Sequence, residues 1–410
     1  MSRIRNLIGS PFEASFLGQR LVQNVEHDWI WQSTAWPNFC WQESAIQPLL
    51  RECHKRMGNL AGKASLSSSE HTSLDTLLGN ILASSAIENE QLNAASVRSS
   101  LAKHLGISEA QPYPTSDRSE GLAEMMVDAL QQHQDPLTLE RLYQWHRWLF
   151  PQDANNTLFK VRVGELRGTE PMQVVSGRLD KPTVHFEAPP RDALESELES
   201  FISWFNAPEH NQENSQALDP LARAAIAHLW FVTLHPFDDG NGRLTRALTD
   251  MALAQGDEQS IRLYAMSGAI LDNRKGYYNI LEQTQKQAQE VEGKLDISAW
   301  VEWFLRTLLT SVESAISTID RTLAKTAFWQ RFNDAGLNKE QIKVLNRLLD
   351  GGPDGFEGGI SAGQYQKVAK VSKATATRHL ADLVAKGCIE KMAGGGRSTR
   401  YRIILDASIG

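Results

Sequence analysis

The pattern of hydrophobic and polar positions predicts a mainly α-helical chain. Hydrophobic residues recur at helical spacing over 74–82, and they cover nearly every side of the segment 219–232. Such an all-round hydrophobic segment is typical of a buried helix, and the Asp-Pro pair at its start suits an N-cap and a first turn. Helical spacing resumes over 247–253. The stretch 235–246 is therefore predicted to be a tight turn between two core helices.

One part of the central region has the pattern of a sheet. Two β-prone runs, 174–175 and 183–186, flank a loop that contains Gly and Asp, which is typical of a hairpin. This hairpin is the only sheet expected in the helical core. An exposed edge strand can hold an extended target segment by main-chain hydrogen bonds, with an ordinary surface hairpin as the alternative. The candidate target-binding residues are Thr183, Val184 and His185.

The C-terminal part has a different pattern. After a Gly-rich linker at 351–355, helices are predicted over 361–369 and 373–386, and two strands over 389–392 and 401–404. Together with a preceding helix, this order predicts a winged helix, which binds either duplex DNA or protein. Nine Lys or Arg stand against two acidic residues between Ile360 and Arg402. The candidate DNA contacts are Lys373, Thr375, Thr377, Arg378, Arg397 and Arg400.

These patterns divide the chain into four parts. They are an N-terminal extension (1–28), an N-terminal helical module (29–110), a helical core (120–325) and the winged helix (335–410). The module begins with several tryptophans, and we expect it to pack on the core.

Composition narrows the class of protein. With 410 residues, 41% of them hydrophobic and 22% charged, the chain is typical of a soluble globular protein. No hydrophobic run reaches the length of a membrane span, and the N-terminus lacks the pattern of a signal peptide. Three cysteines without metal-type spacing favour a reducing cytoplasm. A net charge of −7 gives no reason for the whole chain to coat nucleic acid.

The predicted turn reads His-Pro-Phe-Asp-Asp-Gly-Asn-Gly-Arg-Leu-Thr-Arg, and it concentrates the chemistry. His235 is an imidazole, which exchanges protons near neutral pH and can accept one from an attacking hydroxyl. Asp239 offers the hard oxygen ligand that suits Mg²⁺. These two residues predict proton transfer and metal binding side by side.

The second half of the turn predicts a phosphate site. Gly240, Asn241 and Gly242 allow successive amides to point into one concavity, where the next helix begins. Arg243 and Arg246 lie on one face of that helix and can donate forked hydrogen bonds to terminal phosphates. The turn thus holds the parts needed to bind a nucleoside triphosphate.

This stretch matches, without departure, the signature of the Fic family, His-Pro-Phe-x-[Asp/Glu]-Gly-Asn-Gly-Arg-x-x-Arg. The resemblance implies a Fido helical core with a small β-hairpin flap, and transfer of AMP from ATP to Ser, Thr or Tyr hydroxyls of proteins. It assigns His235 as the base, Asp239 to the metal, the turn 240–242 to an anion hole and Arg243 to the phosphates. Downstream, Tyr277 and Tyr278 resemble a segment that lines the nucleobase pocket, although such a pair is as often part of a core.

A second resemblance lies upstream. The segment from Ser84 to Asn89 resembles the inhibitory pattern of the family, [Ser/Thr]-x-x-x-Glu-[Gly/Asn], in which the glutamate pairs with the last arginine of the motif. The corresponding pair here is Glu88 and Arg246. A carboxylate at that place would remove a phosphate ligand and put negative charge where the γ-phosphate would lie. The alternative is a solvated glutamate at a helix end.

The sequence therefore predicts an AMP transferase, active also on itself and restrained by Glu88. Two alternatives remain: a DNA-binding transcription regulator whose core only senses nucleotide, and a hydrolase that removes AMP from proteins while Glu88 orients water. A donor other than ATP, the target protein and the oligomeric state stay open, although a homodimer would suit a winged helix that reads a two-fold DNA site.

Overall fold

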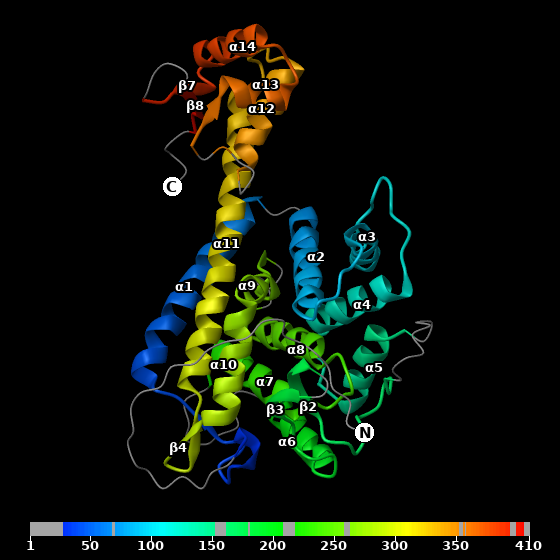
Figure 1. Ribbon diagram of the computed structural model, residues 1–410. Helices are drawn as coiled ribbons and strands as arrows, with labels where there is room; N and C mark the ends of the chain where they lie inside the picture. Colours follow the sequence, from blue (N-terminus) through cyan, green and yellow to red (C-terminus); the bar gives the residue numbers. More distant parts are fainter. Residues whose placement is uncertain are drawn as a thin grey trace. The chain divides into compact units, whose positions relative to one another are not determined.

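The computed structural model describes residues 28–67, 70–151, 161–178, 181–207, 218–257, 263–351, 356, 358–393 and 399–405. The chain forms two compact units (Figure 1). The first runs to Gly62 and resumes over 68–314, and the second combines 63–67 with 315–410. Three subjects of the sequence analysis lie outside the described residues: nearly all of the N-terminal extension, most of the Gly-rich linker, and Arg397.

The first unit is helical, as predicted. Its helices are α1 (Glu43–Ser67, ending in the second unit), α2 (Glu70–Ile87), α3 (Ala94–Leu105), α4 (Asp117–Gln131), α5 (Leu139–Leu149), α6 (Leu194–Asn206), α7 (Pro220–Leu234), α8 (Asn241–Gly256), α9 (Met266–Asp272), α10 (Arg274–Gln287), the first part of α11 (Ser298–Arg331), and the short 3-10 helix η1 (Ile30–Gln32).

Helices α7 and α8 form the centre of this unit and pack against each other (Figure 1). Asp219 caps α7 by accepting a hydrogen bond from the Leu221 amide at 2.9 Å, as predicted. Every residue from Leu221 to Leu234 is buried, which explains the hydrophobic pattern on all sides. The turn between the two helices is thereby held on both sides by buried helices.

The N-terminal module packs on the core, which confirms the expectation. Trp36 meets Trp230 of α7 with ring centroids 6.0 Å apart, and Trp31 donates a hydrogen bond to the Glu187 carbonyl at 2.7 Å. From α2, the Asn80 amide donates to the Asp250 carboxylate of α8 at 2.7 Å. Helix α2 is therefore fixed beside the helix that follows the motif.

The predicted hairpin is present as β2 (Gln173–Arg178) and β3 (Lys181–Glu187), paired antiparallel. The expectation that it would be the only sheet of the core is wrong. Strand β1 (Phe39–Cys40) pairs parallel with β5 (Lys294–Asp296), which pairs antiparallel with β4 (Gln289–Val291). These strands have two or three residues each, too few to produce a readable alternation.

The second unit contains the end of α11 and the predicted C-terminal elements. Its helices are α12 (Lys339–Asp350), α13 (Ala362–Ala369) and α14 (Lys373–Ala385). Strands β6 (Ile360–Ser361), β7 (Ile389–Lys391) and β8 (Arg400–Ile403) form an antiparallel sheet in the order β6-β8-β7. The two helices and the hairpin lie where the sequence predicted them, and β6 is an additional strand. Val344, Tyr365 and Leu380 are among the residues of its own hydrophobic core.

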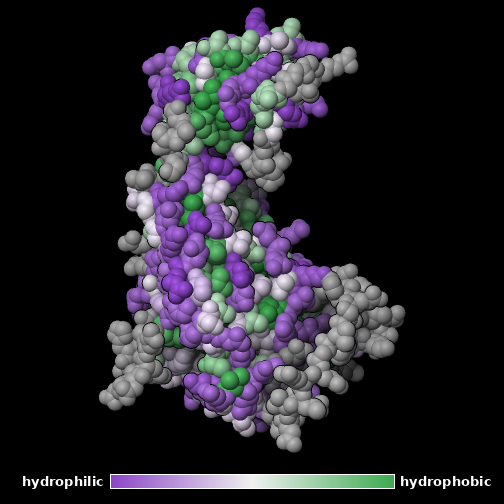
Figure 2. All heavy atoms as spheres, turned by 90° about the vertical axis from the view of Figure 1, so that its left-hand side faces the viewer, coloured by the Kyte–Doolittle hydropathy of each residue, from purple (hydrophilic) through white to green (hydrophobic). Residues whose placement is uncertain are grey.

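In the face drawn in Figure 2, hydrophilic residues cover most of the lower part, and hydrophobic residues gather in the upper part. Among the described helices, none combines the length and the hydrophobicity that crossing a membrane requires. All three cysteines are described and free of disulfide bonds: Cys53 and Cys388 are buried, and Cys40 is half-buried.

Candidate active site

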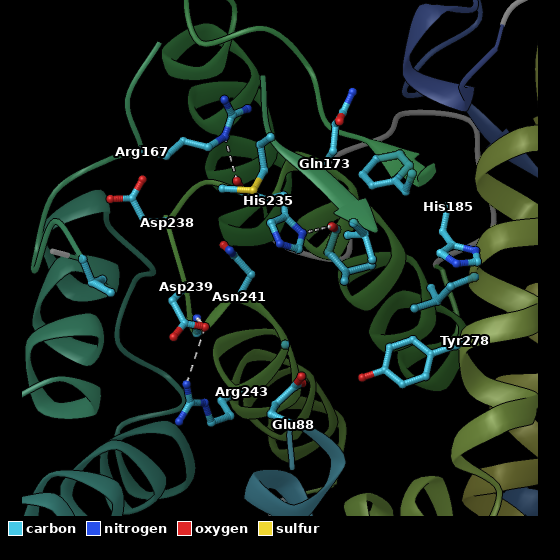
Figure 3. A pocket seen from close by; sticks show the side chains of 18 of the residues that line it. Glu88, Arg167, Gln173, His185, His235, Asp238, Asp239, Asn241, Arg243 and Tyr278 are labelled. Atoms are coloured by element: carbon cyan, nitrogen blue, oxygen red, sulfur yellow. Dashed lines mark hydrogen bonds and ion pairs between the residues drawn. The ribbon is translucent and has the colours of Figure 1, made fainter. Parts of the chain in front are cut away.

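A cavity of about 690 Å³ opens beside the turn between α7 and α8 (Figure 3). Its volume is that of a typical small-molecule site. Its lining includes ten of the fourteen residues predicted for the active site and the flap: Glu88, His185, His235, Asp239, Gly240, Asn241, Gly242, Arg243, Tyr277 and Tyr278. Ser84, Thr183, Val184 and Arg246 do not line it.

His235 ends helix α7 in the left-handed conformation, with φ of 49°, which is rare for a residue with a side chain. Its Nδ1 lies 3.2 Å from the Val232 carbonyl oxygen. Because a carbonyl only accepts, this contact places the ring proton on Nδ1 and the lone pair on Nε2. The half-buried ring lines the cavity with a nitrogen able to take up a proton.

Arg167 holds the backbone of His235 in place, a role the sequence analysis missed. Its Nε donates to the His235 carbonyl at 2.9 Å, its Nη2 to the Pro189 carbonyl at 2.5 Å, and its amide to the Pro236 carbonyl at 3.0 Å. Burial lowers the pKa of this guanidinium to about 10. One buried side chain thus ties the segment after the flap to the turn that carries His235.

His146 of α5 supports the same turn and was also missed. Its ring stacks on Phe237 with centroids 4.3 Å apart, its Nδ1 accepts from the Gly164 amide at 3.0 Å, and its Nε2 lies 3.1 Å from the Asp239 carbonyl. Burial lowers its pKa to about 4, so the ring is neutral at physiological pH and carries its proton on Nε2. Both nitrogens are then satisfied, and the residue is structural.

The start of α8 borders the cavity and has no capping side chain. Gly240 is the N-cap of α8 and offers no side chain to satisfy the first N–H groups of the helix. Its φ of 82° favours glycine, and an added β-carbon would lie 2.6 Å from Leu149. The side chain of Asn241 clamps the turn by exchanging two hydrogen bonds with the backbone of Phe237, at 3.0 and 2.8 Å. The helix start is therefore suited to receive an anion.

Asp239 is the candidate metal ligand. One of its carboxylate oxygens accepts from the Gly240 amide at 2.7 Å and lies 3.8 Å from a guanidinium nitrogen of Arg243. Within the described residues, no group of three His, Cys, Asp or Glu side chains gathers as a metal site. A single carboxylate fits Mg²⁺, which takes few protein ligands when it shares phosphate oxygens, and it does not fit a metal that needs a protein cage.

Arg246 is covered by Glu88. Its Nη2 donates to the Glu88 carboxylate at 2.9 Å and to the Ser84 carbonyl at 2.8 Å, and its Nε donates to the Ser84 hydroxyl at 2.8 Å. The pair implied by the resemblance is thus present. Arg246 is 3% exposed and Glu88 20%, so the carboxylate, rather than the guanidinium, lines the cavity (Figure 3).

A second carboxylate on the same segment, Glu90, contacts Arg243. It also forms hydrogen bonds with Arg118 of α4 at 2.6 to 2.9 Å. All three residues line the cavity. Neither Glu90 nor Arg118 was predicted, because no motif or spacing connects position 118 with position 243.

The two tyrosines differ in their surroundings. Tyr277 is 1% exposed, and its hydroxyl pairs with His228 at 2.9 Å. Most of its contacts are therefore those of a core residue, which was the alternative to a place in the nucleobase pocket. Burial lowers the pKa of His228 to about 3, which keeps that ring neutral. Tyr278 is half-buried, lies under the Arg274 guanidinium at 5.5 Å, and is the better placed of the two to meet a ligand (Figure 3).

The flap lies at another side of the cavity. Thr183 is exposed and Val184 half-buried. His185 lies between the Ser176 hydroxyl, 2.6 Å from its Nε2, and the Glu282 carboxylate, 2.8 Å from its Nδ1. The latter contact connects β3 to α10. Strands β2 and β3 pair only with each other among the described residues, so each has one edge outside the sheet.

Two family models match parts of this chain. Residues 136–253 match the Fic/DOC family, and residues 29–107 match a domain of unknown function, DUF4172. The crystal structure of a Fic family protein from Desulfovibrio desulfuricans G20 has a TM-score of 0.50 at 20% identity, covering 91% of this chain and 99% of that chain. Residues 136–253 thus resemble a Fic/DOC domain, and the chain has the helical Fic fold.

Curated relatives match less than a third of this chain. A uridine 5'-monophosphate transferase of Xanthomonas campestris pv. campestris is 32% identical over 123 residues, or 29% of this chain and 21% of that protein. Protein adenylyltransferase fic-1 of Caenorhabditis elegans is 28% identical over 124 residues, or 30% of this chain and 20% of that protein. The chain therefore spans about a fifth of the length of these relatives.

Proposed function

We propose that this protein transfers AMP from ATP to a Ser, Thr or Tyr hydroxyl of a protein, itself included, and that Glu88 restrains the reaction. One observation carries the proposal: the His235 ring, with its proton on Nδ1, and the start of α8, which has no capping side chain, line one cavity. The match to the Fic/DOC family and the names of the relatives support it.

The reaction follows from the atoms that line the cavity. The hydroxyl oxygen attacks the α-phosphorus, its proton passes to Nε2 of His235, and the bond to the departing pyrophosphate breaks. The amides at the start of α8 and the guanidinium of Arg243 stabilise negative charge on the phosphates. Asp239 would hold Mg²⁺, which neutralises phosphate charge when bound. The turn aligns the acceptor with the leaving group by fixing His235 next to these amides.

Glu88 accounts for the restraint. Its carboxylate occupies Arg246 and places negative charge at the start of α8, where a terminal phosphate would otherwise bind. ATP then binds without a contact to Arg246, the last arginine of the motif, and its pose is misaligned for attack. Substitution of Glu88 by glycine frees Arg246.

The flap supplies the platform for the target. An edge of the β2–β3 hairpin can pair with an extended segment, and the exposed Thr183 lies on it. Main-chain pairing asks little of the target sequence, so many hydroxyls would fit and the protein's own surface is one source.

The test compares wild type, Glu88→Gly and the double variant Glu88→Gly/His235→Ala after incubation with ATP labelled at the α-phosphate. We expect label on Glu88→Gly protein, little on wild type and none on the double variant. Mass spectrometry identifies the transferred group, and UTP serves as the matched donor because one relative is a uridine 5'-monophosphate transferase. Equal labelling of wild type and Glu88→Gly would contradict the restraint.

The same set of proteins separates the alternatives. Nucleotide binding without label on any variant would favour a core that senses nucleotide. Release of AMP from labelled protein by wild type, lost in Glu88→Gly, would favour a hydrolase in which Glu88 orients water.

We further propose that residues 335–410 form a winged helix that binds duplex DNA. Lys373, Thr377 and Arg378 are exposed on α14, the second helix of the helix–turn–helix, and Thr375 is half-buried there. Exposed cations on this helix support groove contacts. Arg400 is partly engaged, since it donates to the Gly359 carbonyl at 2.8 Å. Protein docking is the alternative outcome of the DNA test given in the Discussion.

A further inference from the structure

The turn that follows α2 directs two carboxylates into the cavity. Asn89 has φ of 60°, and the amides of Glu88 and Glu90 both donate to the Ser85 carbonyl at 3.0 Å. This tight turn brings Glu88 and Glu90, two residues apart, to the cavity wall. Each then engages a different arginine of α8: Glu88 pairs with Arg246, and Glu90 with Arg243.

Glu90 also holds a third arginine. Nε and Nη2 of Arg118 donate to its carboxylate at 2.9, 2.6 and 2.7 Å. Arg118 and Arg243 both lie over the ring of Phe150, at 5.5 and 5.3 Å from its centroid. Two guanidiniums on one ring repel each other, and an anion that contacts both offsets this repulsion. Here that anion is the carboxylate of Glu90.

The contacts of these groups indicate that Glu90 satisfies the site only in part. Arg243 is 6% exposed, and its buried Nε has no hydrogen-bond partner among the described residues. Asp239, whose carboxylate lies 3.8 Å from Arg243, does not satisfy this Nε, because its contact is with Nη2. Burial lowers the pKa of both Arg118 and Arg243, because it disfavours their charged forms.

We propose that Arg118 belongs to the polyphosphate site, and that Glu90 is a second internal stand-in for phosphate, which a nucleoside triphosphate displaces from Arg118 and Arg243. The inference rests on the proposed function only in taking this cavity as the nucleotide site. It adds a third arginine to those of the motif, and it makes the segment 88–90 a double restraint. Since Arg118 would serve the polyphosphate, it should discriminate ATP from AMP.

The experiment measures ATP and AMP binding by calorimetry on the 410-residue His235→Ala protein, in which we expect no turnover of ATP. Into this background we introduce Glu90→Gln, Arg118→Gln and Arg118→Lys. The matched control is Glu120→Gln, because Glu120 bridges Lys103 and His104 between α3 and α4 without lining the cavity. Melting temperatures and circular dichroism report on folding.

Glu90→Gln should tighten ATP binding by about tenfold, and Arg118→Gln should weaken it by about tenfold or more, since each changes charge-assisted contacts. AMP affinity should stay within about twofold, and Arg118→Lys should lose less than Arg118→Gln. Glu120→Gln should leave both affinities unchanged. Unaltered or weaker ATP binding by Glu90→Gln, or an unchanged ATP-to-AMP ratio in Arg118→Gln, would show a static bridge and overturn the inference.

Failure of the two proposals can be told apart. If Glu88→Gly protein binds ATP but transfers no label, the proposed function is contradicted, while the ratio of ATP affinity to AMP affinity still tests the role of Arg118. If label transfer is seen and this ratio does not change, only the proposed role of Arg118 and Glu90 is contradicted. Absence of ATP binding in every protein would overturn both.

Discussion

Glu88 lies directly against the α-carbon of Gly242. A β-carbon added to Gly242 would be 2.1 Å from Oε1 of Glu88, the oxygen that accepts from Arg246 at 2.9 Å. No side chain fits between them. The glycine at this position therefore leaves room for the Glu88 carboxylate in the restrained state, and for a phosphate when one is bound. The carboxylate therefore lies against the first turn of α8, where negative charge is favoured by the helix dipole.

Gly242→Ala should destabilise the protein mainly while Glu88 is present. In wild type the new methyl group expels the carboxylate from Arg246, and we expect a loss of about 1–3 kcal/mol in the free energy of unfolding. In Glu88→Gly protein the clash with the carboxylate is gone, and the nearest remaining side-chain atom to the new β-carbon is Nη1 of Arg246 at 3.2 Å, so we expect a change within about 1 kcal/mol of zero. Urea denaturation of the four proteins measures this coupling.

Wild type, the two single variants and the double variant form a double-mutant cycle. This cycle contains its own control, since each substitution is measured with and without the other. An equal effect of Gly242→Ala in both backgrounds would mean that Glu88 does not rest on this helix in solution. That result would also remove the steric basis of the restraint.

Arg167→Lys should slow label transfer and leave ATP affinity unchanged. Lysine keeps the charge but cannot reach the carbonyls of His235 and Pro189 together, so His235 would lose its fixed position. We expect a decrease of about 10- to 100-fold in kcat in the Glu88→Gly background. Labelling rates and calorimetry check it.

The matched control is Arg141→Lys. Arg141 also donates to backbone carbonyls, those of Asp128, Gln132 and Asp135, but it does not line the cavity. Both variants should lose similar stability, and only Arg167→Lys should lose rate. A parallel loss of rate in the two would mean that Arg167 matters for folding alone.

The sequence predicted what is contiguous. The motif, its two flanking helices and the cap at Asp219 follow from residues within one stretch, and the hydrophobic pattern reports burial directly. The pair of Glu88 with Arg246 was accessible only through a resemblance, because 158 positions separate the partners.

Residues brought together by packing could not be predicted in this way. Arg118 and His146 belong to α4 and α5, and their distances from the motif depend on how these helices pack. The pairing of β1 with β5 joins Phe39 to Leu295, and no local pattern encodes such a contact. Glu90 lies next to a recognised motif, yet its partners decide its role.

Asp250 should make stability depend on pH. Burial raises its pKa from 3.8 to about 7, against the opposing hydrogen bond from Asn80. Between these values the unfolded chain releases the proton that the folded chain keeps, so stability falls as pH rises, by about 4 kcal/mol at most. Asp250→Asn removes this group.

The difference in unfolding free energy between Asp250→Asn and wild type should therefore grow in favour of the variant from pH 4 to pH 7 and level off above. Urea denaturation at several pH values measures it, and all other titrating groups cancel because both proteins share them. Curves that run parallel across this range would contradict a raised pKa at Asp250.

DNA binding by the second unit should depend on Arg378 and on salt. Arg378→Glu reverses an exposed charge on α14, and Lys343→Glu makes the same change on α12, away from the predicted contacts. If Arg378 meets a phosphate, its variant should weaken binding to duplex DNA and lower the slope of log Kd against log salt by about one, while Lys343→Glu changes little. Fluorescence anisotropy with labelled duplexes provides both numbers. Equal losses in the two variants would indicate a diffuse electrostatic contact. Absence of any salt-dependent binding would instead leave α14 as a surface for protein docking, because groove binding without counterion release is not expected.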